Sequence, residues 1–119
     1  MSSHVSWMLV LDLQPGREAE FRALMNDMVT ATRADEPGTL DYEWSLSADR
    51  RRCHTFERYA DSAAVMVHLG NFGSKYAERF MGLLTPVGFT IYGAPDAAVK
   101  DALAGFQPTY MEAVGGFSR

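Results

Sequence analysis

The segment from Val5 to Leu13 constrains the fold of this chain more than any other stretch. Side chains on a strand point to alternate faces, and one face of a strand predicted here carries only large apolar residues: Val5, Trp7, Leu9, Leu11 and Leu13. Met8 and Val10 make the opposite face apolar as well. A strand that is apolar on both faces is usually central in its sheet and covered on both sides.

Proline and glycine pairs divide the remainder of the chain into short elements. Apolar residues spaced three or four apart predict helices, and alternating ones predict strands. In chain order we expect a helix over Pro15–Thr32, strands over Thr39–Ser47 and Arg52–Tyr59, helices over Ala63–Leu69 and Ser74–Leu84, a strand over Val87–Gly93, a helix over Asp96–Ala104 and a strand over Thr109–Val114.

This order of elements predicts an α+β fold. Its first part is the split-βαβ or ferredoxin-like order, in which helices cover one face of an antiparallel sheet. The 119 residues suffice for a single domain, with a core at about 5–93 and a helix-and-strand appendix at 95–119. No spare helices remain for the second face. We therefore expect a homodimer in which a second copy of the sheet covers that face.

Composition and charge exclude several classes of function. The chain has 11 Lys and Arg against 15 Asp and Glu, a net charge of −4, and no basic stripe, so we expect no nucleic-acid partner. A single cysteine, Cys53, excludes an internal disulfide and is typical of a reducing compartment. No apolar run approaches the ~20 residues of a membrane span, and no signal peptide is recognisable. We expect a cytoplasmic protein without a membrane partner.

Three stretches resemble the antibiotic biosynthesis monooxygenase (ABM) family. EPGTLDYE at residues 36–43 is similar to the E-x-G-x-x-x-Y-E stretch of that family. FERYADSAA at residues 56–64 resembles its strand ending in E-x-W, followed by an acidic helix start. His68 falls where the family places a histidine at the end of a short helix. The resemblance covers about residues 5–92, which is most of the chain.

The resemblance implies a ferredoxin-like protomer, a dimeric α/β barrel and, often, oxidation of aromatic polyketides or quinols by O₂ without a cofactor. The family also contains haem-degrading enzymes and many proteins with no demonstrated activity. Two positions depart from it. Tyr59 replaces the usual Trp of E-x-W, and Val5–Leu13 lacks the Asn that the haem-degrading branch carries on its first strand.

Three residues are candidates for catalysis. His68 is predicted in the last turn of a short helix, where the dipole favours its charged form; with the resemblance, it becomes a base that removes the proton of a bound phenol. Glu57 and Tyr59 share one face of the third strand, and Glu57 is placed to orient His68 or Tyr59. The alternatives are a capping or core histidine and a structural carboxylate tied to backbone or to an arginine.

Aromatic residues supply candidates for the wall of a binding pocket. Trp44 and Tyr42 share a strand face, and a flat aromatic ligand would pack against such rings. Phe72, Tyr76 and Tyr92 are further candidates, and a place in the core is the alternative for each of them. Metal-ligand spacing and nucleotide-binding motifs are absent from the sequence, so we expect neither a metal nor a cofactor.

The sequence therefore predicts a dimeric, cofactor-independent monooxygenase that oxidises a small planar phenol, quinol or polyketide-like aromatic with O₂. Two alternatives remain at this point. One is a non-catalytic protein that binds a small molecule in the same pocket, and the other is a relative that binds or degrades haem.

Overall fold

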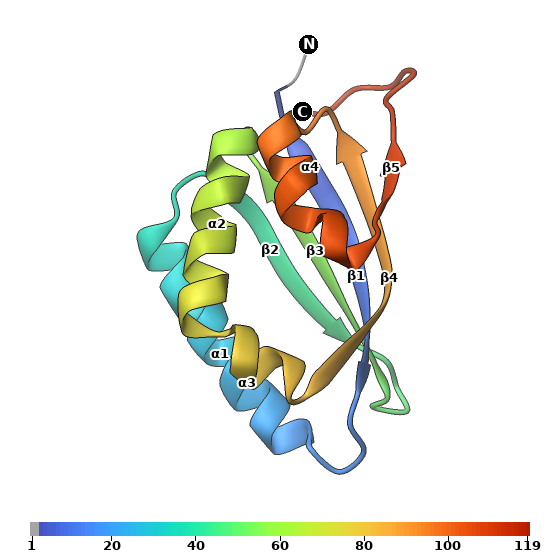
Figure 1. The fold of residues 1–119 in the computed structure, drawn as a ribbon. Helices are drawn as coiled ribbons and strands as arrows, with labels where there is room; N and C mark the ends of the chain where they lie inside the picture. Colours follow the sequence, from blue (N-terminus) through green and yellow to red (C-terminus); the bar gives the residue numbers. More distant parts are fainter. Residues whose placement is uncertain (1–2) are drawn as a thin grey trace.

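The computed structural model describes residues 3–119 (Figure 1). Five strands form one sheet in the order β2-β3-β1-β4-β5. The elements follow one another along the chain as β1 (Val5–Leu13), α1 (Glu18–Asp35), β2 (Thr39–Leu46), β3 (Arg52–Tyr59), α2 (Ser62–Lys75), α3 (Ala77–Met81), β4 (Leu84–Gly93), α4 (Ala97–Leu103), the 3₁₀ turn η1 (Ala104–Phe106) and β5 (Thr109–Met111).

Strand β1 is central, as its two apolar faces predict. It pairs antiparallel with β3 on one side and with β4 on the other, and β2 pairs antiparallel with β3. Only the short β5 is parallel to its neighbour β4. This is the α+β, ferredoxin-like arrangement expected from the order of elements.

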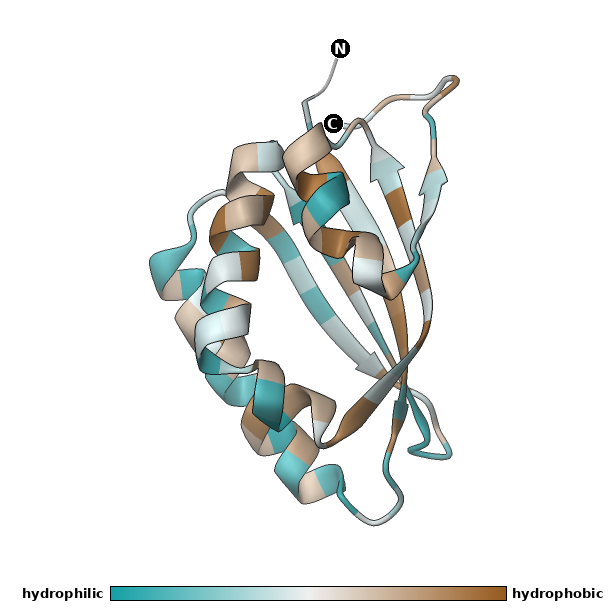
Figure 2. Ribbon diagram, viewed as in Figure 1, coloured by the Kyte–Doolittle hydropathy of each residue, from teal (hydrophilic) through white to brown (hydrophobic). Residues whose placement is uncertain are grey.

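The helices cover one face of this sheet and leave the other open (Figure 1). On the covered face, Val5, Trp7 and Leu11 of β1 are buried, whereas Met8 and Val10 on the open face are only partly buried. Figure 2 shows apolar bands along β1 and β4 and on α4, with hydrophilic residues on the outer turns of α1. The core therefore lies between the sheet and its single layer of helices.

Helix α2 differs most from its predicted bounds. The sequence predicts a helix over Ala63–Leu69 that ends before Gly70, because glycine often follows the last residue of a helix, but α2 runs from Ser62 to Lys75. Gly70 has no positive φ, and a Cβ there would meet nothing within 4 Å, so nothing at this position requires a turn. The second predicted helix, over Ser74–Leu84, is correspondingly reduced to α3.

Helices α2 and α4 each begin at an aspartate N-cap. Asp61 accepts a hydrogen bond from the backbone N–H of Ala64 at the start of α2. Asp96 does the same for Val99 at the start of α4. Both are N-cap contacts of the kind that Asp favours, and they fix where two helices of the covering layer begin.

The C-terminal segment leaves the sheet earlier than predicted. The strand expected to extend to Val114 ends at Met111, and Val114 and Phe117 are 99% and 83% exposed. Because it carries Tyr110, Val114 and Phe117, this tail is expected to pack on its own sheet edge or on a partner; within residues 3–119, its pairing with the sheet is limited to the three residues of β5. Within residues 3–119, none of the helices has the length and hydropathy needed to cross a membrane.

Candidate functional site

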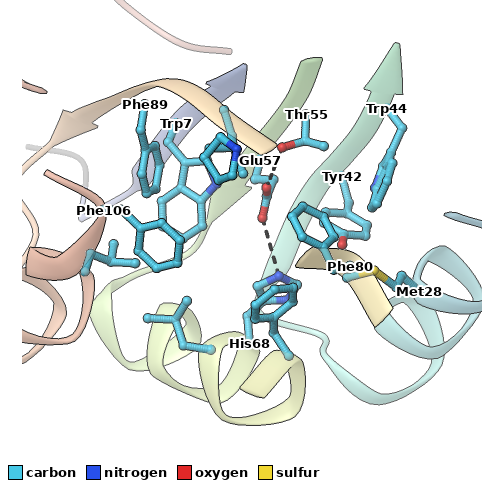
Figure 3. A pocket seen from close by; sticks show the side chains of 15 residues that line it. Trp7, Met28, Tyr42, Trp44, Thr55, Glu57, His68, Phe80, Phe89 and Phe106 are labelled. Atoms are coloured by element: carbon cyan, nitrogen blue, oxygen red, sulfur yellow. Dashed lines mark hydrogen bonds and ion pairs between the residues drawn. The ribbon is translucent and has the colours of Figure 1, made fainter. Parts of the chain in front are cut away.

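A cavity lies between the covered face of the sheet and the helices α2 and η1 (Figure 3). Its volume is about 70 Å³; on this scale a single water needs about 10–15 Å³, so it holds roughly five waters or one small ring. Its lining is mostly aromatic and aliphatic, with the rings of Trp7, Tyr42, Trp44, Phe72, Phe80, Phe89 and Phe106. Three polar side chains also line it: Thr55, Glu57 and His68.

Glu57 is the carboxylate at the centre of the site. The strand register places it directly opposite Trp7 of β1 and Tyr42 of β2. Its Oε1 accepts a hydrogen bond from the Tyr59 hydroxyl at 2.5 Å, and its Oε2 accepts one from the Thr55 hydroxyl at 2.9 Å. Glu57 is buried, and its charged-group neighbour is His68 rather than an arginine, with Nε2 of His68 3.4 Å from Oε1 of Glu57. The predicted alternative of a carboxylate tied to an arginine is therefore wrong.

His68 is held between two buried carboxylates. Its Nδ1 lies 2.7 Å from Oε1 of Glu36, and because a carboxylate only accepts, Nδ1 carries the hydrogen. Glu36 also accepts hydrogen bonds from Asn71, at 3.2 Å, and from Thr39, at 3.2 Å. The contact between Nδ1 and Glu36 fixes the orientation of the ring. As a result, the second nitrogen, Nε2, points towards Glu57. Glu36, His68 and Glu57 form a continuous polar chain that ends in the apolar cavity, where His68 and Glu57 are part of the lining.

The position of His68 corrects one step of the sequence argument. His68 was expected in the last turn of a short helix, with its charged form favoured by the helix dipole. It lies instead in the middle of α2, which continues to Lys75, and dipole effects fall off within the last turn. The two carboxylates, rather than the dipole, are the charges that act on this imidazole.

Burial and the nearby carboxylate keep the hydroxyls of the site protonated. Burial raises the pKa of Tyr59 well above its usual range, and the charge of Glu57 raises it further. The same two causes raise the pKa of Tyr42. The Cys53 thiol has its pKa raised to about 12 by burial and by Glu57. Tyr59 is thus a hydrogen-bond donor to Glu57 rather than an anion.

Two indole N–H groups among the residues that line the cavity, those of Trp7 and Trp44, have no hydrogen-bond partner within residues 3–119. Trp7 is 3% exposed, and the Trp44 ring meets the Tyr42 ring edge to face, with centroids 6.0 Å apart. Within residues 3–119, no group of three His, Cys, Asp or Glu side chains is placed to hold a metal ion.

Comparison with known proteins identifies the family. The sequence model of the antibiotic biosynthesis monooxygenases matches residues 5–79. The chain belongs to this family. The matched segment contains Glu36, Glu57 and His68, whereas β4, α4 and η1 lie beyond it. A search of curated proteins finds no match.

Several solved structures are similar to this chain. Rv0793 from Mycobacterium tuberculosis is 32% identical, with a TM-score of 0.60, over 81% of this chain and 99% of its own. MupZ from Pseudomonas fluorescens is 24% identical, with a TM-score of 0.88, over 100% of this chain and 91% of its own. SnoaB from Streptomyces nogalater is described as a cofactor-independent oxygenase. It is 18% identical, with a TM-score of 0.65, over 81% of this chain and 97% of its own. The latter two likenesses show the fold.

The ABM fold brings most of the predicted site residues together. Trp44, Tyr42 and Phe72 line the cavity beside Glu57 and His68. Tyr59 lies behind Glu57, fully buried, with its ring 5.4 Å from the His68 ring.

Two predicted wall residues lie elsewhere. Tyr76 packs against the core between the sheet and α1, and it does not line the cavity. Tyr92 is on the open face and 42% exposed, because the alternation of β4 turns its neighbour Ile91 inward. Neither is therefore a wall of this cavity.

Sequence reasoning missed several residues of the site. Glu36 entered only as part of the ABM-like stretch, and no role was assigned to it. Trp7 and Thr55 share the covered face with Glu57, so the alternation of β1 and β3 could have placed them there. Phe89 and Phe106 meet edge to face, with centroids 6.1 Å apart, and no sequence pattern indicated that this pair closes the cavity.

Proposed function

We propose that this ABM-family protein is a cofactor-independent monooxygenase that oxidises a small phenolic or quinol ring with O₂. The observation that carries the proposal is the polar chain of Glu36, His68 and Glu57, which ends in an otherwise apolar, aromatic cavity. The family assignment supports it, as does the description of SnoaB as a cofactor-independent oxygenase.

Proton removal is the first task of such an enzyme. A carboxylate has about four lone-pair positions; the hydroxyls of Tyr59 and Thr55 take two of those on Glu57. A further position is available to a hydroxyl in the cavity. Glu57 accepts the proton of the bound quinol, and His68 at its side shares it. Proton transfer to a positioned base of this kind contributes about 10²–10⁴-fold to the rate.

Electron transfer follows from deprotonation. A quinolate is electron-rich and passes an electron to O₂ more readily than the neutral quinol does. Recombination at a ring carbon forms a carbon–oxygen bond, the O–O bond breaks, and one oxygen leaves as water. For hydroquinone, one quinol and one O₂ give one hydroxyquinone and one water, with all four electrons supplied by the substrate. The chain's task is to hold the ring, accept the proton and exclude water.

The cavity favours a single ring over a large polyketide. Its volume of about 70 Å³ accommodates roughly one small ring. The rings of Tyr42 and Trp44 form one wall, and those of Trp7 and Phe89 form the other (Figure 3). Aromatic walls of this kind bind a flat ligand by edge and face contacts.

We also propose that the protein is a homodimer formed through the open face of the sheet. Met8 and Phe56 pair across β1 and β3 at the centre of that face, next to Val10, and all three remain partly exposed in a single chain. An obligate interface of about 2,000 Å² or more would bury them.

Oxygen uptake tests the enzymatic proposal. Hydroquinone is supplied in air without added flavin or metal, and ¹⁸O₂ is used to label the product. We expect enzyme-dependent uptake and one labelled oxygen in the hydroxyquinone. His68→Ala should lower the rate by about 10²–10⁴-fold while circular dichroism stays unchanged.

Three results would count against this function. Binding of the quinol without uptake would indicate the non-catalytic alternative, and a Soret band on titration with haem would favour the haem-binding one. An unchanged rate in His68→Ala with a lowered melting temperature would make His68 a structural residue.

A further inference from the structure

The two ends of the cavity are closed in different ways. One end is closed by Met28 and Phe80, which are buried and belong to the core between the sheet and α1. The other end is closed by Phe106 of η1, which is 43% exposed. Figure 3 shows these two ends on opposite sides of Glu57. All other described residues that line the cavity are buried or partly buried, so Phe106 is the lining residue with the largest exposed fraction.

Helix α4 fixes the place of this end wall. Val99 and Leu103 of α4 are buried and pack in the core cluster that contains β1 residues. At the start of the helix, the backbone N–H of Asp96 donates a hydrogen bond to the hydroxyl of Ser62 on α2, at 3.0 Å. The helix is thus anchored at both ends, and η1 follows it directly. Phe106 is therefore carried to the cavity by an element that the core holds in place.

The turn that presents Phe106 is itself well defined. Its ring meets the ring of Phe89 edge to face, with centroids 6.1 Å apart. The next residue, Gln107, has a φ of 51° and a ψ of 53°, and its N–H donates to the carbonyl of Ala104 at 3.1 Å. A left-handed backbone at a residue other than glycine is uncommon and persists where the surrounding structure imposes it. The geometry of η1 therefore holds the ring of Phe106 over this end of the cavity.

We infer that Phe106 is the residue that limits the ligand of this cavity to a single ring. A second fused ring cannot extend past Met28 and Phe80 without opening the core. It can extend at the other end only if Phe106 turns into the solvent and gives up its contact with Phe89, which is a favourable aromatic pair. This inference rests on the proposed function for the hydroxyl that is bound at Glu57, and it goes beyond it by naming the residue that decides the size of the phenol.

The size limit and the proposed chemistry lie in different parts of the chain. The polar chain of Glu36, His68 and Glu57 is within the segment that matches the ABM family, residues 5–79, whereas Phe106 lies beyond that segment. Phe106 also makes none of the hydrogen bonds that hold the polar chain. A substitution at Phe106 should therefore change which ring binds and leave the polar chain intact.

Anaerobic calorimetry with phenol and 2-naphthol tests the size limit. The two probes share the hydroxyl and differ by one fused ring, and without O₂ neither is oxidised. Phe106→Ala should raise the affinity for 2-naphthol relative to phenol by at least about 10-fold over the wild type, because even one methylene changes selection in an apolar pocket by about that factor. Phe117→Ala is the matched control: it removes an exposed ring from the same end of the chain, outside the cavity, and it should keep the wild-type ratio.

A companion variant guards against a loss of folding. Phe106→Leu shortens the end wall but keeps an apolar side chain against Phe89. It should give a ratio between those of the wild type and Phe106→Ala, with a melting temperature close to the wild type. This variant decides the question if Phe106→Ala fails to fold.

Three results would overturn the inference. The first is a ratio of affinities that stays at the wild-type value in both Phe106 variants. The second is an equal rise of that ratio in Phe117→Ala, and the third is a wild-type protein that binds neither probe. Failure of the proposed function gives a different result: a ratio that depends on Phe106, with no oxygen uptake when hydroquinone is supplied in air, would leave the size limit in place and remove the oxidation.

Discussion

The two faces of the sheet differ in chemistry although they share every strand. The covered face carries Glu57 and Tyr59, both buried, and it forms the floor of the cavity. The open face carries Arg58, in an ion pair with Asp41, and the partly exposed Phe56. Successive side chains of β3 thus alternate between the buried cavity side and the partly exposed open face of the sheet.

This difference shows that the position of a residue in the alternation of its strand, more than its type, decides whether its side chain enters the core or faces outward. Ile91 and Tyr92 are neighbours in β4, yet Ile91 is in the core and Tyr92 is 42% exposed. An aromatic residue becomes a wall of the site only if its parity along the strand turns it inward. The following predictions test that division.

The largest effect is expected from Glu57, and its chain neighbour Arg58 serves as the control. Glu57→Gln keeps an oxygen that accepts from Tyr59 or Thr55 but removes the proton acceptor. Oxygen uptake with hydroquinone should fall by about 10²–10⁴-fold. Arg58→Gln, one residue further along β3, should leave the rate within about twofold. Similar losses in both variants would contradict the separation of the faces.

A charge introduced on the open face should weaken dimer formation rather than turnover. Phe56→Glu places a carboxylate where the proposed partner sheet packs. We expect association to weaken by at least about 100-fold, about 2.7 kcal/mol, because an unpaired charge is desolvated in the interface. Sedimentation at micromolar concentration should then show a dimer for the wild type and a monomer for the variant. A wild-type monomer at that concentration would refute the dimer outright.

Glu36 should have an intermediate effect on turnover. It touches His68 and not the cavity, so we regard it as a positioning residue. Glu36→Gln retains an acceptor but removes the charge, and we expect the rate to fall by about 10–100-fold, the loss typical when the hydrogen-bond partner of a metal-bound histidine is removed. The pH profile of the rate should shift together with that loss. A lower melting temperature with an unchanged pH profile would assign Glu36 a structural role only.

The smallest effect concerns alkaline stability. Burial and Glu57 raise the pKa of Tyr59 in the folded protein. Below about pH 10 the phenol is protonated in both states. Above it, the unfolded chain loses the proton that the folded chain keeps, so the free energy of unfolding falls with pH, by up to about 1.4 kcal/mol per pH unit for each such group.

Urea unfolding between pH 10 and 11 measures this slope. Tyr59→Phe should make it shallower by about the contribution of one group. Tyr110→Phe, at the surface near the C-terminus, serves as the control and should keep the wild-type slope. Equal slopes in all three proteins would show that the buried phenol does not control alkaline unfolding.

Much of the fold follows from the sequence because strands impose a strict period. β1 and β3 have the bounds that alternation predicts, Val5–Leu13 and Arg52–Tyr59. Glycine is a weaker signal: Gly70 was expected to end a helix, but it has no steric need to do so. Only tertiary packing of α2 on the sheet decides that the helix continues to Lys75.

The strict alternation of strands also made part of the site predictable. Glu57 and Tyr59 could be placed on one face from β3 alone. The contact of Glu36 with His68 joins residues 32 positions apart, and it depends on how the end of α1 meets the middle of α2. No local pattern encodes that meeting, so the residue that holds the imidazole was the one most easily overlooked.

The way the sheet ends at its two edges limits how copies of this chain associate. At one edge β5 has only three paired residues, and at the other β2 carries Asp41 and Glu43. Short edge strands and charged edge residues are the devices by which proteins discourage strand-by-strand growth into fibrils. With lateral addition of strands disfavoured at both edges, the partly exposed Met8, Val10 and Phe56 on the open face are left to pack against another sheet face to face.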